Sequence, residues 1–171
     1  PNACASSVRP TLTMVYMPTT VFAPPFYELQ GSVLGSGAAP ALYAVSVEES
    51  HAIQGAVNLL TFRFQSNMIL PPGTIILVTG IQGSPHDSGQ IGVYSQEGLA
   101  LGGVPLFQCF AQAGSAGRAM LDTAASSLSL EVSEACTIPA GFQVAFAVAI
   151  RNPTAPQAAP AVSISASHPG C

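Results

Sequence analysis

Apolar and polar residues alternate in short runs that recur about every ten positions after residue 40. The clearest run covers residues 58–65. Here Leu60, Phe62 and Phe64 share one face of an extended chain, and the polar residues Thr61 and Arg63 lie on the other face. An alternation of period two is typical of a strand that buries one face. Runs of the same kind predict further strands, over residues 42–47, 74–79, 90–95, 106–113, 119–122, 127–132, 142–150 and 161–166.

Turn residues separate these runs, and the 16 glycines and 15 prolines leave little room for long helices. Only residues 115–127 are rich enough in alanine to suggest a helix, but Gly117 and Asp122 interrupt them and no apolar stripe runs along them. We therefore predict a strand, a turn and a strand there. Many short strands in regular succession favour an all-β fold, and we predict an immunoglobulin-like antiparallel β-sandwich over residues 41–171.

Two turns share the pattern apolar–Pro–x–Gly before an apolar strand, at residues 70–74 (LPPGT) and 138–142 (IPAGF). Proline fixes φ for the turn, and glycine supplies a positive φ before the strand begins. The repeated pattern has two interpretations. The turns are either equivalent crossing points in two halves of a sandwich or two uses of a favoured hairpin turn.

Residues 1–40 have a different character, and we interpret them as an extended arm followed by a linker. Residues 11–17 alternate like a strand, but three prolines soon break the apolar stretch that follows. Residues 31–40 are a Gly/Ser/Ala-rich linker without periodicity. A free arm would expose several large apolar side chains to water, namely Leu12, Met14, Tyr16, Val21, Phe22, Phe26 and Tyr27.

An extended apolar segment of this kind can bury itself along a sheet edge, either in its own domain or in a neighbouring subunit. The chain contains no lysine, which is one common device that blocks edge pairing. This favours the neighbouring subunit, and we expect self-association, or association with neighbouring modules of the same assembly, through the arm.

Charge is scarce throughout the chain. Only 7% of the residues are charged, the net charge is −4, and the mean hydropathy is +0.45, whereas about a quarter of the residues are charged in a typical soluble domain. Neighbouring subunits, a glycan coat or a membrane could cover such a surface. No apolar run approaches the roughly 20 residues of a spanning helix, so we expect no membrane span. Four scattered arginines and the absence of tryptophan also argue against nucleic acid as a partner.

The four cysteines show no spacing of a metal site, and we expect neither a metal nor a cofactor. An even number of cysteines in a lysine-free chain favours disulfides and an extracellular or cell-surface location. Of the three possible pairings we favour Cys109–Cys136 inside the domain and Cys4–Cys171 between the ends. The alternative is that two or more of these residues are buried free thiols.

The densest polar cluster is residues 83–89 (GSPHDSG). A hydrolase would use Ser84 or Ser88 with His86 and Asp87, but adjacent residues of an extended chain point apart and cannot orient one another as a catalytic triad requires. No Gly-x-Ser-x-Gly elbow is present either. The cluster is therefore interpreted as a turn-rich loop, and we expect that the protein is not an enzyme.

Glycans could supply the missing surface polarity. The chain has no acceptor sequence for N-linked glycans, because proline follows Asn152 in its one Asn-x-Thr triplet. Accessible prolines and the many Ser and Thr residues could carry hydroxyproline-linked or O-linked glycans. The candidate attachment sites are Pro24, Pro25, Pro71 and Pro72. Unmodified Ser and Thr residues in turns and on strand faces remain the alternative.

Five segments follow one another in a distinctive order, at residues 54–62 (QGAVNLLTF), 67–73 (NMILPPG), 79–84 (TGIQGS), 138–141 (IPAG) and 150–166, which begins IRNP and ends APAVSISA. This order resembles a module that is repeated in very large extracellular proteins of algae and other protists. Mastigoneme proteins, which form hairs on flagella, are among the surface assemblies to which the pattern is similar. The resemblance implies a structural role without catalytic residues, and the arm lies outside it.

Two functional hypotheses follow. The first is a structural subunit or module of an extracellular filament, flagellar hair or cell-surface coat, which the arm, the scarce charge and the resemblance favour. The second is a glycan-binding or cell-adhesion module that uses the loops around residues 80–90 or 96–105. Sugar sites use aromatic faces, and Tyr94 and Phe107 are the aromatic residues nearby.

Overall fold

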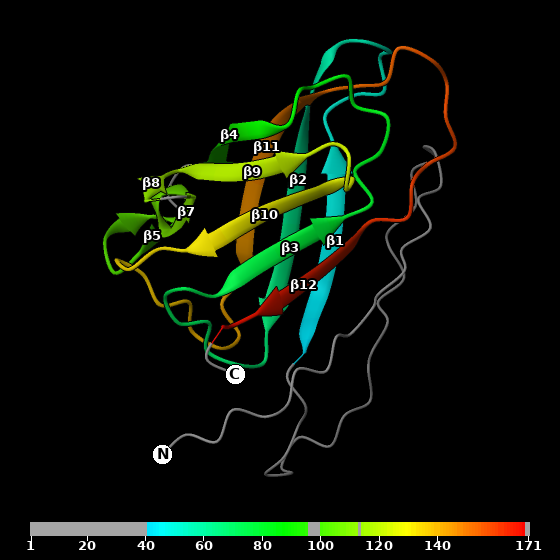
Figure 1. Ribbon diagram of the computed structural model, residues 1–171. Coiled ribbons are helices and arrows are strands. Elements are labelled where there is room, and N and C mark those ends of the chain that lie inside the picture. Colours follow the sequence, from blue (N-terminus) through cyan, green and yellow to red (C-terminus); the bar gives the residue numbers. More distant parts are fainter. Residues whose placement is uncertain (1–40, 96–99, 113, 170–171) are drawn as a thin grey trace.

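The computed structural model describes residues 41–95, 100–112 and 114–169, and the predicted arm and linker lie outside these residues. The described part is built from strands, with one turn of 3-10 helix (Figure 1). In chain order the elements are β1 (Leu42–Glu49), β2 (Val57–Ser66), β3 (Ile75–Thr79), β4 (Gly89–Ser95), β5 (Ala100–Leu101), β6 (Val104–Pro105), η1 (Leu106–Cys109), β7 (Phe110–Gln112), β8 (Ser115–Ala116), β9 (Arg118–Asp122), β10 (Ser127–Val132), β11 (Val144–Arg151) and β12 (Ser163–Ser167). The prediction of an all-β fold is therefore confirmed.

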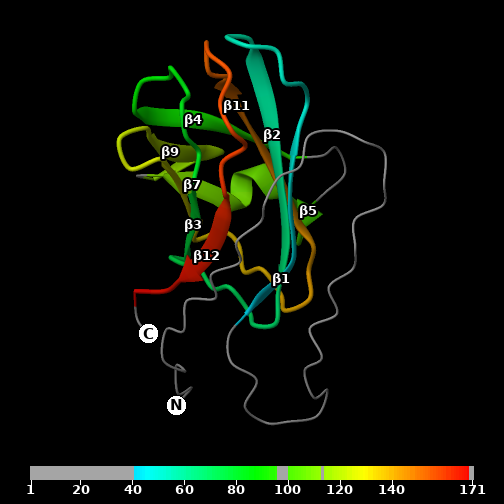
Figure 2. The same ribbon diagram turned by 90° about the vertical axis from the view of Figure 1, so that its right-hand side faces the viewer.

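One continuous antiparallel sheet runs in the order β1-β2-β11-β4-β9-β10-β3-β12, with β7 and β8 attached beside β10. The sheet folds over at β4, because Gly89–Gly92 pair with β9 whereas Val93–Ser95 pair with β11. Figure 2 shows the two resulting layers, with β1, β2 and β11 on one side and β3, β12 and β9 on the other. The two ends of the sheet, β1 and β12, come to lie side by side (Figure 1), so that the sheet is nearly closed like a barrel.

Aromatic rings fill the space between the layers. The rings of Phe62 and Phe146 stack with their centroids 5.2 Å apart, and Phe110 from the opposite layer meets Phe146 at 5.4 Å. All three side chains are buried, together with Phe64. Rings of this size supply a large share of the apolar area that a domain removes from water on folding. The alternation that predicted β2 therefore reports which of its residues face this core.

The sequence predicts one continuous strand over residues 106–113, but the described residues 106–112 do not form it. They form the helical turn η1 and then the short strand β7. Leu106 and Cys109 are both fully buried, and a spacing of three residues puts both on one side of a 3-10 turn but on opposite faces of a strand. Burial of this pair therefore prevails over strand propensity. Residues 115–127 behave as predicted, with strands on either side of a turn at residues 123–126.

The two apolar–Pro–x–Gly turns lie against each other. Leu70 and Ile138 form an antiparallel bridge in which each N–H donates to the other carbonyl, at 2.9 and 3.0 Å. Gly73 and Gly141 have φ values of 79° and 75°, as such a turn requires. The first turn leads from β2 to β3 and the second from β10 to β11, so each carries the chain from one layer to the other. The structure matches the first of the two interpretations, a pair of equivalent crossing points.

Candidate assembly and binding surfaces

The polar cluster at residues 83–89 is divided between two neighbouring segments. The Ser84 hydroxyl donates to the carbonyl of Arg151 at 2.9 Å, at the end of β11. Ser88 forms a 2.9 Å hydrogen bond with the hydroxyl of Thr123 and accepts one from its N–H at 3.0 Å, in the turn between β9 and β10. Neither serine hydroxyl bonds to the ring of His86 in the described part of the chain. The two serine hydroxyls therefore fasten the loop to the end of β11 and to the turn between β9 and β10.

Asn58 organises the same end of the domain and is only 1% exposed. Its side-chain oxygen accepts hydrogen bonds from the N–H and the hydroxyl of Ser50, at 3.0 and 2.9 Å. Its amide donates to the side-chain oxygen of Asn152 at 2.9 Å and to a carboxylate oxygen of Glu49 at 3.3 Å. The amide of Asn152 in turn donates to the carbonyls of His51 and Ile53. This network joins the end of β1, the start of β2 and the end of β11.

We expect the substitution Asn58→Leu to lower the free energy of unfolding by about 2 kcal/mol, because leucine fills a similar volume but removes the hydrogen bonds that the buried amide makes to Ser50, Glu49 and Asn152. Urea unfolding followed by circular dichroism measures the change. Gln65→Leu is a matched control, since Gln65 is an amide on the outer face of the same strand and should cost less than about 0.5 kcal/mol. Equal effects of both substitutions would contradict the role assigned to the network.

Several residues of the segments that carry the family resemblance make contacts of the same structural kind. The amide of Gln157 donates to the carbonyl of Gln82 at 3.1 Å. The side-chain oxygen of Asn67 accepts from the N–H of Ala41 at 2.8 Å, and its own N–H donates back to the carbonyl of that residue. These polar side chains fasten loops and turns.

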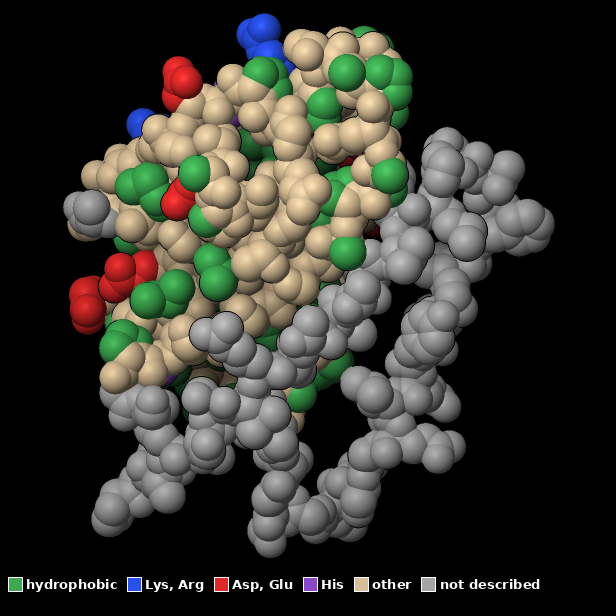
Figure 3. All heavy atoms as spheres, turned by 45° about the vertical axis from the view of Figure 1, so that its right-hand side comes forward, with side chains coloured by type: hydrophobic (Ala, Val, Ile, Leu, Met, Phe, Trp, Pro, Cys, Tyr) green, Lys and Arg blue, Asp and Glu red, His purple; other side chains and the backbone are tan. Residues whose placement is uncertain are grey.

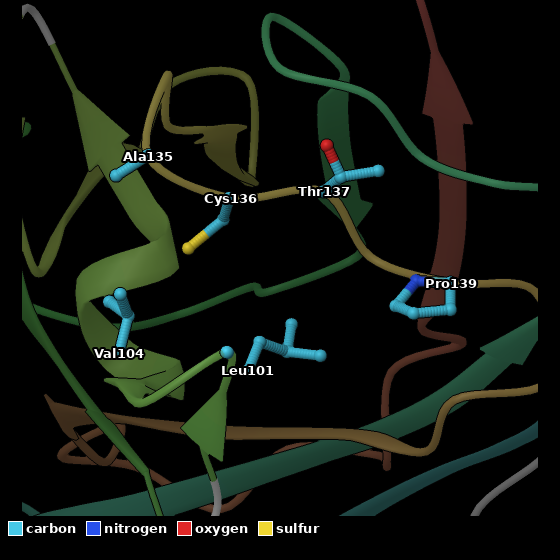
Figure 4. Close-up of a pocket in the computed structure, with 7 residues that line it drawn as sticks. Leu101, Val104, Ala135, Cys136, Thr137 and Pro139 are labelled. Atoms are coloured by element: carbon cyan, nitrogen blue, oxygen red, sulfur yellow. The ribbon is translucent and has the colours of Figure 1, made fainter.

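One surface hollow measures about 230 Å³ and lies between the β5–β6 hairpin and the loop that follows β10 (Figure 4). Its labelled lining residues are Leu101, Val104, Ala135, Cys136, Thr137 and Pro139. The lining contains no ionisable side chain apart from a cysteine that is held in a disulfide. Nothing in this lining suits proton transfer or metal binding.

Another hollow, of about 280 Å³, lies on the outer face of β2, β11 and β4. Its floor includes Ala145 and Ala147, which are only 7% exposed although they point away from the core. They are sheltered because taller side chains stand on both sides, Leu59 and Arg63 on β2 and Tyr94 on β4. Tyr94 is 54% exposed and is the one exposed large aromatic side chain in the described residues. This small-residue trough with an aromatic wall places an exposed ring beside polar side chains, as a binding surface requires.

The two edge strands of the sheet differ in how they are guarded. The ladder of β1 is broken by a bulge between Tyr43 and Ser46, where Ala44 has a φ of 50°. On the same strand, Glu48 forms an ion pair with Arg63 at 2.6 Å. In contrast, β12 pairs with β3 in unbroken register along all its residues and contains neither a charged residue nor a proline. Bulges and charges are the usual protection of an edge, so β12 is the unguarded one.

Exposed charge is sparse over the domain surface. On the face shown in Figure 3, the few Asp, Glu and Arg side chains gather mainly toward the left and upper parts, and apolar and uncharged polar groups form most of the rest. Large apolar side chains that are exposed on the described residues are Ile53, Val57, Leu59, Met68, Ile69, Ile75 and Tyr94. Such residues are individually common on protein surfaces, but here few charges accompany them.

The remaining predicted site residues fall into three groups. Cys109 and Cys136 are joined by a disulfide, which is the pairing favoured from the sequence. Pro71 and Pro72 are half-buried in the first crossing turn. The others lie outside the described residues, namely Cys4, Cys171, Pro24, Pro25 and the arm residues Leu12, Met14, Tyr16, Phe22, Phe26 and Tyr27. Phe107, the second candidate aromatic, is half-buried beside Gly117 and packs against the core.

No family model, curated protein or solved structure matches this chain. Among the described residues, no three His, Cys, Asp or Glu side chains gather where they could hold a metal ion. The described part of the chain also has no helix long and apolar enough to cross a membrane.

Proposed function

We propose that this chain is a structural subunit or module of an extracellular filament, flagellar hair or cell-surface coat. The observation that carries the proposal is a charge-poor domain surface next to a strand edge that has no charge, proline or bulge. Charge keeps soluble proteins apart, and its scarcity favours association. In this proposal the two layers are those of an immunoglobulin-like sandwich, and the arm and the sheet edges connect one copy to the next.

The placement of the polar side chains supports a mechanical role. Asn58, Asn152, Ser84 and Ser88 hold loops and strand ends together. The disulfide adds a covalent link of a kind that persists in oxidising surroundings outside the cell. A domain built in this way suits repeated use in an assembly, where rigidity is more useful than a mobile reactive site.

Electron microscopy of the full chain at native concentration tests the proposal. We expect elongated or ordered polymers, because uncharged edges and apolar surface associate once the subunit concentration is high enough. Analytical ultracentrifugation of the same preparation gives the distribution of assembly sizes. Monodisperse single subunits in both measurements would contradict the proposal.

The trough beside Tyr94 favours a second candidate, a glycan-binding or adhesion module. An exposed aromatic ring next to Arg63, Thr61 and Ser95 offers a stacking face together with hydrogen-bonding groups. Single subunits that bind immobilised glycans would favour this candidate over the filament. Binding should then be lost in Tyr94→Ala and retained in Tyr94→Phe, which keeps the ring.

A further inference from the structure

The unguarded edge of β12 has the properties of an acceptor for a further strand. We infer that it accepts residues 11–17 of the arm of a neighbouring copy of this chain. The inference rests on the proposed function and deepens it, because it names the two surfaces that join one subunit to the next. Three observations support it: the regular and uncharged edge of β12, the pattern of side chains on β12 and the apolar residues near that strand.

An antiparallel strand uses alternate backbone groups to bond each of its two neighbours. On one side, β12 pairs with β3 from Ser163↔Thr79 to Ser167↔Ile75 without a shift in register. On its other side it has no strand partner within the described part of the sheet, although β1 lies near it. The backbone groups on that side of a regular, uncharged strand form a template for another strand.

The side chains of β12 and of residues 11–17 alternate in the same way. Ile164 is buried in the core and Ala166 packs against it, whereas the hydroxyl of Ser163 lies on the outer face, 2.7 Å from that of Thr79. The arm sequence TLTMVYM likewise places Thr11 and Thr13 on one face and Leu12, Met14 and Tyr16 on the other, although Val15 and Met17 follow on the threonine face. Pairing of the two strands would extend the outer row of hydroxyls with Thr11 and Thr13 and the inner row of apolar side chains with Leu12, Met14 and Tyr16. A shift by one residue would reverse both rows, so the alternation restricts the register.

The core is incompletely covered where β1 and β12 meet. Apolar residues at this seam pack against the core but remain partly exposed, namely Leu42, Val45 and Val47 on β1 and Val162 and Ala166 on or beside β12. A strand on the edge of β12 would bring Leu12, Met14 and Tyr16 to the same side of the sheet. Their burial together with the seam residues is favourable for both partners, because apolar area is removed from water on each side.

Two features point to the arm of another copy. Residues 18–40 join the candidate strand to β1, and they would span about 75 Å when extended, enough to reach a neighbouring domain. Four prolines in this stretch favour extended conformations, which would give the linker this reach. A subunit that docked its own arm would still expose the charge-poor surface that favours association.

Cysteine cross-linking of the full chain tests the inference. A Cys4→Ser/Cys171→Ser background retains the native Cys109–Cys136 bond, and its assembly is first verified by sedimentation. Thr13→Cys and Ser165→Cys are then introduced into separate chains, which are mixed and oxidised. We expect a covalent dimer that contains one chain of each kind, identified by intact mass. The inward-facing Leu12→Cys should cross-link to Ser165→Cys at least tenfold less.

Ser46→Cys provides the matched control, because it places the same change on the outer face of the guarded edge strand β1. Equal cross-linking to that position would overturn the choice of β12. A double variant that cross-links within one chain and yields no dimer would show that the arm docks on its own domain. Absence of any cross-link in chains that do assemble would overturn the inference and leave the proposed function intact. Failure of the background chain to assemble would instead contradict the proposed function itself.

Discussion

Breaking the Cys109–Cys136 disulfide is expected to lower the free energy of unfolding by about 3 kcal/mol. The bonded residues are 27 positions apart, and closing a loop of that length restricts the unfolded chain. The folded domain keeps other links at this crossing, since β7 pairs with β10 and the N–H of Ser133 donates to the carbonyl of Cys109 at 2.9 Å. We therefore expect the folded domain to survive with a midpoint of thermal unfolding about 10 °C lower.

Circular dichroism during heating, with and without reductant, measures this effect. The Cys4→Ser/Cys171→Ser variant isolates it, because reductant then acts on one bond. Adding Cys109→Ala and Cys136→Ala should lower the midpoint by a similar amount and abolish its dependence on reductant. If reductant leaves the midpoint of the first variant unchanged, both the stabilising role of the bond and the argument for an oxidising compartment are wrong.

The strands were predictable because most of them bury one face and leave the other partly exposed. In β2 the burial of Phe62 and Phe64 follows the apolar positions of the sequence. The run at residues 142–150 is apolar at nearly every position for a different reason. Its inward residues fill the core, while Ala145 and Ala147 form the floor of the outer trough. A sequence pattern records that a residue is sheltered but not which surface shelters it.

The path of the sheet was beyond the reach of the sequence pattern. Strand β4 bonds to β9 along its first half and to β11 along its second, and this exchange turns two layers into one continuous sheet. Pairing partners depend on contacts between distant parts of the chain, which a local alternation does not encode. The mutual bridge between Leu70 and Ile138 is a further long-range feature, although the repeated turn motif did indicate that the two sites are equivalent.

We did not predict the network around Asn58, although the sequence contains a signal for it. Asn58 occupies the same face of β2 as Leu60 and Phe62, so the alternation assigns a polar amide to an inward position. An amide there must be hydrogen-bonded, and Asn152 supplies the partner from the far end of the chain. A polar residue in register with a buried face is thus a usable signal of a structural network, whereas the residues at 83–89 attracted attention only by their chemical types.

Deletion of residues 1–30 is expected to abolish assembly and to leave a folded β-domain. The deleted segment holds the apolar residues that would join copies, from Leu12 to Tyr27. All the strands described here begin at Leu42 or later, and the rings of the central core, such as Phe62 and Phe146, lie within them. Far-UV circular dichroism and the midpoint of thermal unfolding report on the fold, and analytical ultracentrifugation reports on assembly.

A full-length variant with Leu12→Ser, Met14→Ser and Tyr16→Ser controls for the length of the arm. It should also lose assembly, because these apolar side chains are the ones that the acceptor edge would bury. An unfolded deletion variant would show that the arm belongs to the core of its own domain. A deletion variant that is folded and still polymerises would show that the arm is not the connector. The outer face around Leu59 and Tyr94, whose side chains are both exposed, would then be the next surface to substitute.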